Sequence, residues 1–218
     1  MPPLRIAHRG YARLGGENTL EAFRNAARLG AEAFEIDVRR RRDGVLVVHH
    51  DRSDAPQAPL LLDVLKLAAE SGVEVNLDLK ASDLQEPLIA AVREAGMLGR
   101  TTCTGGNWPL LLDIHQRERG IRAGITVPKR LAPGFLQPLQ RWWYAFRLPV
   151  LLKVYEAGVI SAHHRLVNRA VVRRTHGAGA QVWAWTVDDP REIARLERAG
   201  VDGIASDAPQ SQSGLRAE

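Results

Sequence analysis

Cysteine is nearly absent from this sequence, which contains only Cys103 in 218 residues. No intrachain disulfide can form, and a metal centre built on several thiolates is excluded. With 45% hydrophobic and 25% charged residues, the composition is that of a globular protein, so a disordered or collagen-like chain is excluded as well. The single thiol is expected to fill the core.

Long apolar runs are also missing. The longest candidate for a membrane segment, Leu148–Val154, contains a proline and a lysine and is far too short to span a bilayer. The amino terminus shows no charged region followed by a long apolar stretch, so no secretory signal is evident. These absences predict a soluble, cytoplasmic protein. The length suits one domain, because a single α/β barrel commonly needs roughly 200–250 residues.

Lysine is scarce, although the chain is basic. Only four of the 30 basic residues are lysines, and against 25 acidic residues they give a formal net charge of +5. The arginines are spread through the chain, which favours a bias of composition over a nucleic-acid-binding arm, while attraction to phosphate-bearing partners stays open as the alternative. The densest run, Arg39–Arg42, leads into the hairpin signal Asp43-Gly44 and is predicted to be a solvated strand end.

Short runs rich in Val and Ile alternate with helical patterns along the whole chain. Strands are expected at Leu4–Ala7, Phe34–Val38 with a hairpin extension at Val45–His49, Glu74–Leu79, Thr101–Thr104, Arg122–Val127, Val159–Ser161, Gln181–Trp185 and Gly203–Ser206. Helices are expected at Thr19–Leu29 (capped by Asn18 or Thr19), Leu60–Glu70, Leu84–Ala95, Pro109–Arg119, Leu136–Phe146, Leu166–His176 and Pro190–Ala199.

About eight strand–helix units predict an α/β fold, a single closed (β/α)8 TIM barrel over residues 1–209. The remaining residues, 210–218, are expected to form a frayed tail. An open doubly wound sheet is the alternative, but it usually carries a glycine-rich dinucleotide loop, and none follows the first strand.

Polar side chains gather at the ends of the predicted strands. In chain order they are His8, Arg9, Glu35, Asp37, His50, Asn76, Asp78 and Lys80. Residues two positions apart on a strand face the same side, and the carboxyl ends of successive strands meet at one rim of a barrel. We therefore expect these side chains to share one cavity.

Three carboxylates that face one space repel one another, and a bound cation relieves that repulsion. The all-oxygen set Glu35, Asp37 and Asp78 suits one divalent cation, Mg²⁺ or Ca²⁺, better than zinc. The competing interpretation is that Glu35 and Asp37 form structural ion pairs with nearby arginines.

Two histidines and two cations complete the predicted cavity. His8 and His50 beside a bound metal ion suit acid–base catalysis. Arg9 and Lys80 would supply fixed positive charge for an anion such as phosphate.

These residues carry a resemblance to a known family. The motifs His8-Arg9-Gly10, Glu17-Asn18-Thr19, Glu35-Ile36-Asp37-Val38, Asp43-Gly44 with Val47-Val48, and His50-Asp51 occur in the order and spacing of the glycerophosphodiester phosphodiesterase family, within the PLC-like phosphodiesterase superfamily. Further similar segments are Asn76-Leu77-Asp78-Leu79-Lys80, Trp185-Thr186-Val187-Asp188 and Gly200–Ile204 with Ser206-Asp207 and Pro209. The similarity runs from about residue 5 to 209 and is loose between 100 and 160.

The resemblance implies a TIM barrel that hydrolyses glycerophosphodiesters to glycerol 3-phosphate and an alcohol with one divalent cation. Matched motif by motif, the metal ligands would be Glu35, Asp37 and Asp78, and the acid–base pair His8 and His50. Arg9 and Lys80 would contact the phosphate, Glu17 would orient Arg9 or His8, and Trp185 would form an apolar wall.

Two departures from the family pattern bear on the substrate. Asp78 stands where the family usually has Glu, as in the spider-toxin phospholipase D branch, so the cation must sit nearer that strand or take a water. Only Arg52–Pro59 replaces an element that usually continues into a small inserted subdomain covering the head-group pocket. An open rim would admit bulkier diesters, so a lysophospholipase D-like activity on lysophospholipids is the alternative function.

The remaining expectations concern partners and single histidines. The stretch Trp142–Phe146 mixes aromatics and arginine as interfacial segments do, which predicts weak contact with a membrane surface, the alternative being a core-facing helix followed by a buried stretch. His49 should face away from His50, and His163 and His164 could reach the rim. No nucleic-acid partner and no obligate protein partner are expected. The rival classes are a catalytically silent binding protein and a nucleic-acid-binding module.

Overall fold

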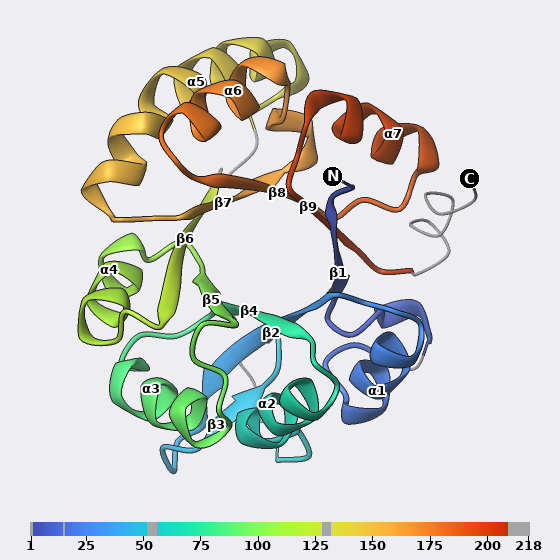
Figure 1. The fold of residues 1–218 in the computed structure, drawn as a ribbon, viewed down its shortest axis with the longest axis vertical. Helices are drawn as coiled ribbons and strands as arrows, with labels where there is room; N and C mark the ends of the chain where they lie inside the picture. Colours follow the sequence, from blue (N-terminus) through green and yellow to red (C-terminus); the bar gives the residue numbers. More distant parts are fainter. Residues whose placement is uncertain (1, 15, 52–55, 128–131, 209–218) are drawn as a thin grey trace.

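The computed structural model describes residues 2–14, 16–51, 56–127 and 132–208. Eight parallel strands close into a barrel, because the first strand pairs with both the second and the last (Figure 1). They are β1 (Leu4–His8), β2 (Ala33–Arg40), β4 (Glu74–Leu79), β5 (Thr101–Thr104), β6 (Ile121–Val127), β7 (Val159–His163), β8 (Gln181–Trp185) and β9 (Gly203–Ser206). The predicted TIM barrel is confirmed.

Helices surround the barrel on the outside (Figure 1). They are α1 (Leu20–Arg28), α2 (Leu61–Glu70), α3 (Gln85–Glu94), α4 (Trp108–Arg117), α5 (Gln137–Val154), α6 (Arg169–Gly177) and α7 (Pro190–Ala199), with 3-10 turns η1 (Ala12–Leu14), η2 (Gly134–Leu136) and η3 (His164–Leu166). The helix predicted to stop at Phe146 is wrong at its end, since α5 runs through Pro149 to Val154. The expected tail, 210–218, lies outside the described residues.

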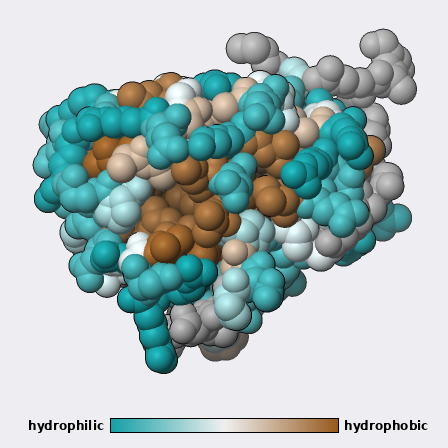
Figure 2. Space-filling model, turned by 90° about the horizontal axis from the view of Figure 1, so that it is seen from below, coloured by the Kyte–Doolittle hydropathy of each residue, from teal (hydrophilic) through white to brown (hydrophobic). Residues whose placement is uncertain are grey.

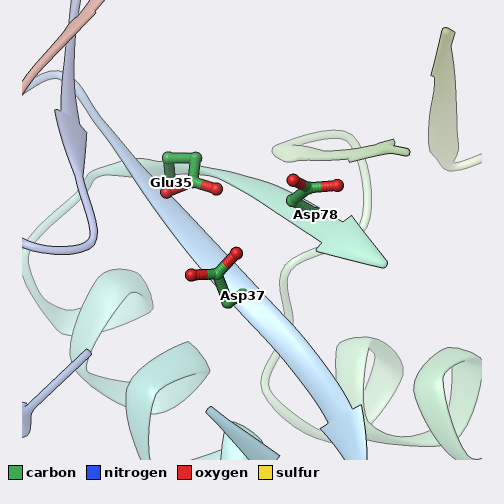
Figure 3. Close-up of side chains that lie close together, drawn as sticks. All are labelled: Glu35, Asp37 and Asp78. Atoms are coloured by element: carbon green, nitrogen blue, oxygen red, sulfur yellow. The ribbon is translucent and has the colours of Figure 1, made fainter. Parts of the chain in front are cut away.

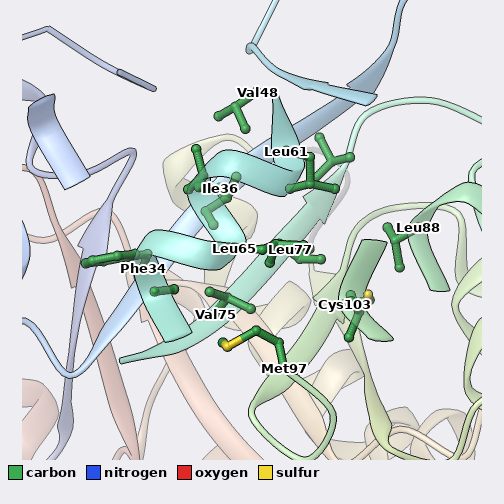
Figure 4. Packing of buried hydrophobic residues seen from close by; sticks show 14 of the residues in the cluster. Phe34, Ile36, Val48, Leu61, Leu65, Val75, Leu77, Leu88, Met97 and Cys103 are labelled. Atoms are coloured by element: carbon green, nitrogen blue, oxygen red, sulfur yellow. The ribbon is translucent and has the colours of Figure 1, made fainter. Parts of the chain in front are cut away.

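Strand β2 shows how the sequence divides between the two sides of the barrel wall. Phe34 and Ile36 point outward and pack against α1 and α2 in the main hydrophobic cluster (Figure 4). Glu35 and Asp37 alternate with them and therefore point inward. Both faces of the strand are buried, as expected for parallel strands covered by helices.

A small apolar cluster fills the lower barrel interior. It consists of Ile6, Ala33, Val159, Trp183 and Ala205. Gly203 makes room for the largest member, because a Cβ at that position would lie 2.7 Å from Trp183 Cδ1. The barrel is thus plugged below by side chains, and polar groups are left to the carboxyl rim above.

The predicted hairpin forms after β2, where β3 (Leu46–Val48) pairs antiparallel with it. Gly44 takes a positive φ of 90° in the turn, which a residue without Cβ tolerates best. Among the described residues between β3 and α2 there is no helix or strand, and part of the Arg52–Pro59 segment, residues 52–55, lies outside them. The face formed by α1, α2 and α3 is hydrophilic at its edges, with hydrophobic residues gathered near its centre (Figure 2).

Candidate active site

A cavity of about 480 Å³ opens at the carboxyl ends of the strands. Seven of the nine predicted site residues line it: His8, Arg9, Glu35, His50, Asp78, Lys80 and Trp185. The other two are absent from the lining. Asp37 is fully buried, and Glu17 contacts Arg9, whose Nη1 donates to Glu17 Oε2 at 2.6 Å.

Strand register brings the three predicted metal ligands together. Glu35 of β2 is paired with Asn76 of β4, and Asp37 with Asp78. Each of the three acidic residues offers a carboxylate oxygen within 4.8 Å of the other two, and the three side chains converge in Figure 3. The two-residue spacing in the sequence therefore correctly predicted which side chains of these strands face the barrel interior.

Cationic and amide groups hold the deepest of these carboxylates. Lys80 Nζ donates to Asp78 Oδ2 at 2.6 Å and lies 3.1 Å from Asp37 Oδ1. Arg9 Nε lies 3.1 Å from Asp37 Oδ2, which also accepts from Asn18 Nδ2 at 2.9 Å. In this structure, the two residues predicted to contact phosphate are paired with the acidic cluster at the cavity floor.

The three carboxyl groups ionise unequally. Burial raises the pKa of Glu35 to about 7, and the nearby Asp37 and Asp78 carboxylates add to the rise. Burial likewise raises the pKa of Asp78. Burial also opposes ionisation of Asp37, but Lys80, the Asn18 hydrogen bond and Arg9 outweigh it and hold that pKa below its usual range. A cation bound among these groups would oppose the rises, because a nearby positive charge favours the ionised form of a carboxyl group.

The structure pairs His8 with an acidic partner from the other end of the chain. His8 Nδ1 lies 2.6 Å from Asp207 Oδ1, and His8 Nε2 lies 3.8 Å from Glu35 Oε2. Burial disfavours the imidazolium, yet Glu35 and the bond to Asp207 outweigh it and raise the pKa of His8 above its usual 6.5. Asp207 fixes the ring so that Nε2 points toward the carboxylates.

His50 lines the same cavity and is more accessible than His8. Its Nδ1 lies 3.0 Å from Asp51 Oδ1, and its side chain is 40% exposed. His49 is absent from the cavity lining, as expected for the residue next to His50 on an extended segment.

Arg39 is a site residue that the sequence interpretation missed. Rather than being solvated, it is half-buried, and its guanidinium donates to the backbone oxygens of His50 at 2.9 Å and Lys80 at 3.0 Å. It thereby ties together the ends of two segments that carry site residues. The remainder of the run, Arg40–Arg42, fits the predicted strand end and turn.

Asn18 was predicted as one of two candidate caps of the first helix, but its side chain binds Asp37 instead. Thr19 caps α1, its hydroxyl accepting from Ala22 N at 3.0 Å. Asn18 is buried, with a positive φ of 58°, and binds Asp37. A strained backbone at this position is consistent with a functional constraint.

At the far wall, Trp185 closes the cavity beside a pair of histidines. The ring of His163 lies 5.2 Å from that of Trp185 in an edge-to-face arrangement and stacks on His164 at 4.6 Å. Of the two histidines, neither lines the cavity itself. His164 instead bonds to Glu192 of α7 at 2.7 Å.

The acidic cluster fits a hard divalent cation. The three ligand oxygens lie within 4.8 Å of one another, so small movements of the side chains would bring all three to the Ca–O distance of roughly 2.4 Å, or with further closure to the shorter Mg–O distance. All donors are carboxylates and no sulfur ligand is near, which argues against a soft metal ion. A metal ion can therefore bind between Glu35, Asp37 and Asp78.

The barrel, with histidines and a carboxylate cluster at its carboxyl rim, defines a TIM-barrel enzyme. The model of the glycerophosphoryl diester phosphodiesterase family matches residues 8–55 and 139–211. A protein named "Probable glycerophosphodiester phosphodiesterase 2" from Mycobacterium tuberculosis is 31% identical over 94% of this chain and 87% of its own. The chain therefore belongs to the glycerophosphoryl diester phosphodiesterase family and is a phosphoric diester hydrolase.

Other relatives agree with this assignment. A glycerophosphodiester phosphodiesterase from Caldanaerobacter subterraneus is 27% identical, covering 97% of this chain and 96% of the relative. An Oleispira antarctica phosphodiesterase, solved in complex with the product sn-glycerol-3-phosphate, superposes with a TM-score of 0.78 at 24% identity over 99% of this chain and 98% of that one. A lysophospholipase D from Rattus norvegicus is 20% identical over 94% of this chain and 83% of its own.

Proposed function

We propose that this enzyme hydrolyses glycerophosphodiesters to glycerol 3-phosphate and an alcohol, using a divalent cation and two histidines. The observation that carries the proposal is the meeting of His8, His50, Glu35 and Asp78 on one cavity at the barrel rim, with Asp37 completing the acidic cluster. The product bound by the Oleispira antarctica phosphodiesterase, sn-glycerol-3-phosphate, supports the same substrate class for this chain.

Glu35, Asp37 and Asp78 would hold the cation, which when bound supplies positive charge for the phosphate oxygens. Arg9 and Lys80 line the same cavity, and their fixed charges would bind the phosphate as well. The pairing of both residues with Asp37 keeps them oriented before substrate arrives, so little reorganisation is needed on binding.

His8 and His50 would divide the proton transfers. In the net reaction water adds across the bond between phosphorus and the alcohol oxygen. One histidine would take a proton from the attacking water, or from the glycerol 2-hydroxyl in a first step whose cyclic phosphate is then opened by water. The other would give a proton to the departing alkoxide. The pairing of His8 with Asp207 and of His50 with Asp51 would hold each ring in orientation.

The second candidate is a lysophospholipase D-like activity. It is favoured by the absence of helices and strands among the described residues between β3 and α2, where the family usually inserts a subdomain that covers the head-group pocket. A pocket without that cover loses contacts to a small head group. An acyl chain can offset this loss, because each buried CH₂ contributes about 0.8 kcal/mol.

The test is to compare kcat/KM for glycerophosphocholine and for lysophosphatidylcholine below its micellar concentration, with purified protein. Release of glycerol 3-phosphate and of lysophosphatidic acid is measured separately. We expect both diesters to be cleaved with similar efficiency. A preference of a hundredfold or more for the water-soluble diester would contradict the open-rim argument and leave the first activity alone. Cleavage of neither substrate would contradict the proposed function itself.

A further inference from the structure

Helix α5 presents an apolar face to solvent. Leu139, Trp142, Phe146 and Val150 are each between 62% and 65% exposed, and their spacing of three or four residues places them on one side of the helix. The opposite side, with Ala145, Leu148 and Leu152, is buried against the barrel. The predicted alternative, a core-facing helix followed by a buried stretch, is thus wrong for Trp142 and Phe146, although the opposite side of the helix does face the core. We define the outer face of α5 as Leu139, Trp142, Trp143, Phe146 and Val150 of the helix, together with Phe135 of the preceding turn η2.

The aromatic rings of this face are organised among themselves and with a cation. Trp142 and Phe146 stack with centroids 6.1 Å apart, and the Arg147 guanidinium lies 5.1 Å from the ring of Trp143. Tryptophan beside arginine, on a helix whose other side is anchored, is the composition of helices that lie at the boundary between head groups and acyl chains.

Positive charge is concentrated in the part of the chain that contains α5. Residues 119–187 contain eleven of the 30 Lys and Arg residues but only one of the 25 Asp and Glu residues, Glu156. That single carboxylate is already paired with Arg119 at 2.5 Å. The excess positive charge of the protein therefore resides in this part of the barrel, and the rest of the chain has more acidic than basic residues.

Several of these cations flank the outer face of α5. Arg147 and Lys153 are exposed on α5 itself, which has no acidic residue. Helix α6 packs against α5 (Figure 1) and adds exposed Arg169, Arg173 and Arg174. An apolar face bordered by cations complements a surface that is negatively charged above and apolar beneath.

The amino-terminal half of α5 lies beside the active-site mouth. A cleft at the rim is lined by Gly134, Gln137 and Arg141, from η2 and α5, together with Thr186. Thr186 also lines the active-site cavity. A surface in contact with the start of α5 would therefore lie next to the opening through which substrate enters.

We propose that the outer face of α5 docks on anionic lipid bilayers and holds the active-site opening beside the membrane surface. A second copy of this chain is a poorer occupant, because face-to-face packing would bring like charges together. A nucleic acid would use the cations but has no complement for exposed Leu139 and Val150. The advantage for catalysis, access to diesters carrying an acyl chain, rests on the proposed function, whereas the docking itself does not.

The experiment is co-flotation of the purified protein with vesicles, in the absence of any substrate. We expect vesicles of equimolar phosphatidylglycerol and phosphatidylcholine to bind at least about tenfold more tightly than pure phosphatidylcholine, with binding weakened by salt. The triple variant Trp142→Ala, Trp143→Ala, Phe146→Ala should bind at least about tenfold more weakly, as should the double variant Arg147→Glu, Lys153→Glu.

Matched controls come from α1, on another side of the barrel. Leu29→Ala removes a side chain that is 49% exposed, and Arg24→Glu with Arg28→Glu reverses two exposed cations. Neither should change vesicle binding. Turnover of glycerophosphocholine in solution should be unchanged in the triple variant, which separates failed docking from failed catalysis.

Several results would overturn the proposal. They are absence of vesicle binding by the wild-type protein, unchanged binding by the triple variant, and equal losses in the α1 controls. Two others would replace it: a wild-type dimer in size-exclusion chromatography that the triple variant dissociates, without vesicle binding, or binding to a single-stranded oligonucleotide and not to vesicles.

Discussion

Asp207 connects the last barrel strand to His8, the proposed acid–base residue at the end of the first strand. It follows β9 directly and holds His8 Nδ1 at 2.6 Å, while its own backbone N–H donates to Asp188 Oδ1 at 2.9 Å. The bond from His8 lowers the pKa of Asp207, so the carboxylate stays ionised at neutral pH. We therefore propose that Asp207 positions His8 rather than donating a proton itself.

This arrangement predicts graded losses of activity. His8→Ala and His50→Ala should each lower kcat about 10²–10⁴-fold, as expected for acid–base groups. Asp207→Asn should lower kcat by a smaller factor with little change in KM, because the ring remains but is no longer fixed in orientation. Steady-state kinetics on glycerophosphocholine measure both constants, and Asp207→Glu should restore part of kcat.

Thermal unfolding provides the control for the Asp207 variant. A loss of kcat that follows a lowered Tm, and that Asp207→Glu does not reverse, would contradict the positioning role. Wild-type rates in His8→Ala or His50→Ala would remove that histidine from the reaction.

At the scale of single residues, side chains two positions apart along one strand were predictable. A hydrogen bond between residues far apart in the sequence was not. Glu35 with Asp37, and Asp78 with Lys80, were predictable because positions two apart share a face of a strand. The bond between His8 and Asp207 joins residues 199 positions apart, and no periodicity encodes it. Arg39 was misassigned because its place in a run of arginines indicated a solvent-exposed side chain. In the structure it is half-buried, and its guanidinium donates to two backbone carbonyl groups.

At the level of elements, α7 is fastened to the turn η3 through Glu192. Its carboxylate accepts from Arg195 at 2.7 and 2.8 Å and contacts His164 Nδ1 at 2.7 Å. Arg195 in turn donates to the backbone oxygens of His164 and Val167. The hydrogen bond from Arg195, helped by that to His164, lowers the pKa of Glu192 to about 2.

Glu192→Gln should therefore lower the free energy of unfolding by about 1–2 kcal/mol at pH 6. Because the pKa is depressed in the folded state, the contribution is complete above about pH 4.5 and is lost as pH falls from there toward 2. Urea unfolding at pH 6 and at pH 3.5 should show the difference between wild type and variant shrinking at the lower pH.

Glu197 on the same helix is the matched control. Burial raises its pKa, so its ionised form does not stabilise the fold at pH 6, and Glu197→Gln should be neutral or slightly stabilising. Equal destabilisation by both substitutions would contradict the assignment of the effect to the Glu192 network.

The elements themselves were largely predictable, with one instructive exception. Strands such as Thr101–Thr104 and Gln181–Trp185 have the predicted bounds, because glycines and polar residues punctuate the apolar runs. Helix α5 was predicted too short, since Pro149 normally ends a helix. Burial of Leu148 and Leu152 against the barrel favours continuation of the helix despite the backbone hydrogen bond that Pro149 cannot make.

At the scale of the molecule, closure of the barrel depends on a close approach around β9. This strand pairs with both β8 and β1, and a Cβ on Gly203 would lie 2.7 Å from Trp183 Cδ1 and 3.0 Å from Ile6 Cδ1. The interior apolar cluster leaves no room for it. Closure of the parallel strands into a barrel was predictable from the number of strand–helix units. The packing contact between Gly203 and Trp183 was not.

Gly203→Ala should destabilise the protein by about 1–3 kcal/mol, the usual cost of overpacking a filled core. Gly177→Ala, at the end of α6 with no atom within 4 Å of the added Cβ, should be neutral or slightly stabilising. Urea unfolding of both variants gives the comparison, and a tolerated Gly203→Ala would contradict the packing account of the interior.

Within the described part of the chain, no helix combines the length and apolarity needed to cross a membrane. Membrane contact in this account is confined to the outer face of α5, on the flank of the barrel. The chemistry itself is placed at the carboxyl rim, where the acidic cluster and the two histidines meet.

The most direct test of the central claim is the metal dependence of glycerol 3-phosphate release from glycerophosphocholine. Wild-type protein should lose activity in EDTA and regain it when excess Mg²⁺ or Ca²⁺ is added. Asp37→Ala and the isosteric Asp37→Asn should be inactive under both conditions while keeping the circular dichroism spectrum of the wild type. Full activity of wild type in EDTA, or of either Asp37 variant with added metal ion, would contradict the assignment of Glu35, Asp37 and Asp78 as the site of an essential cation.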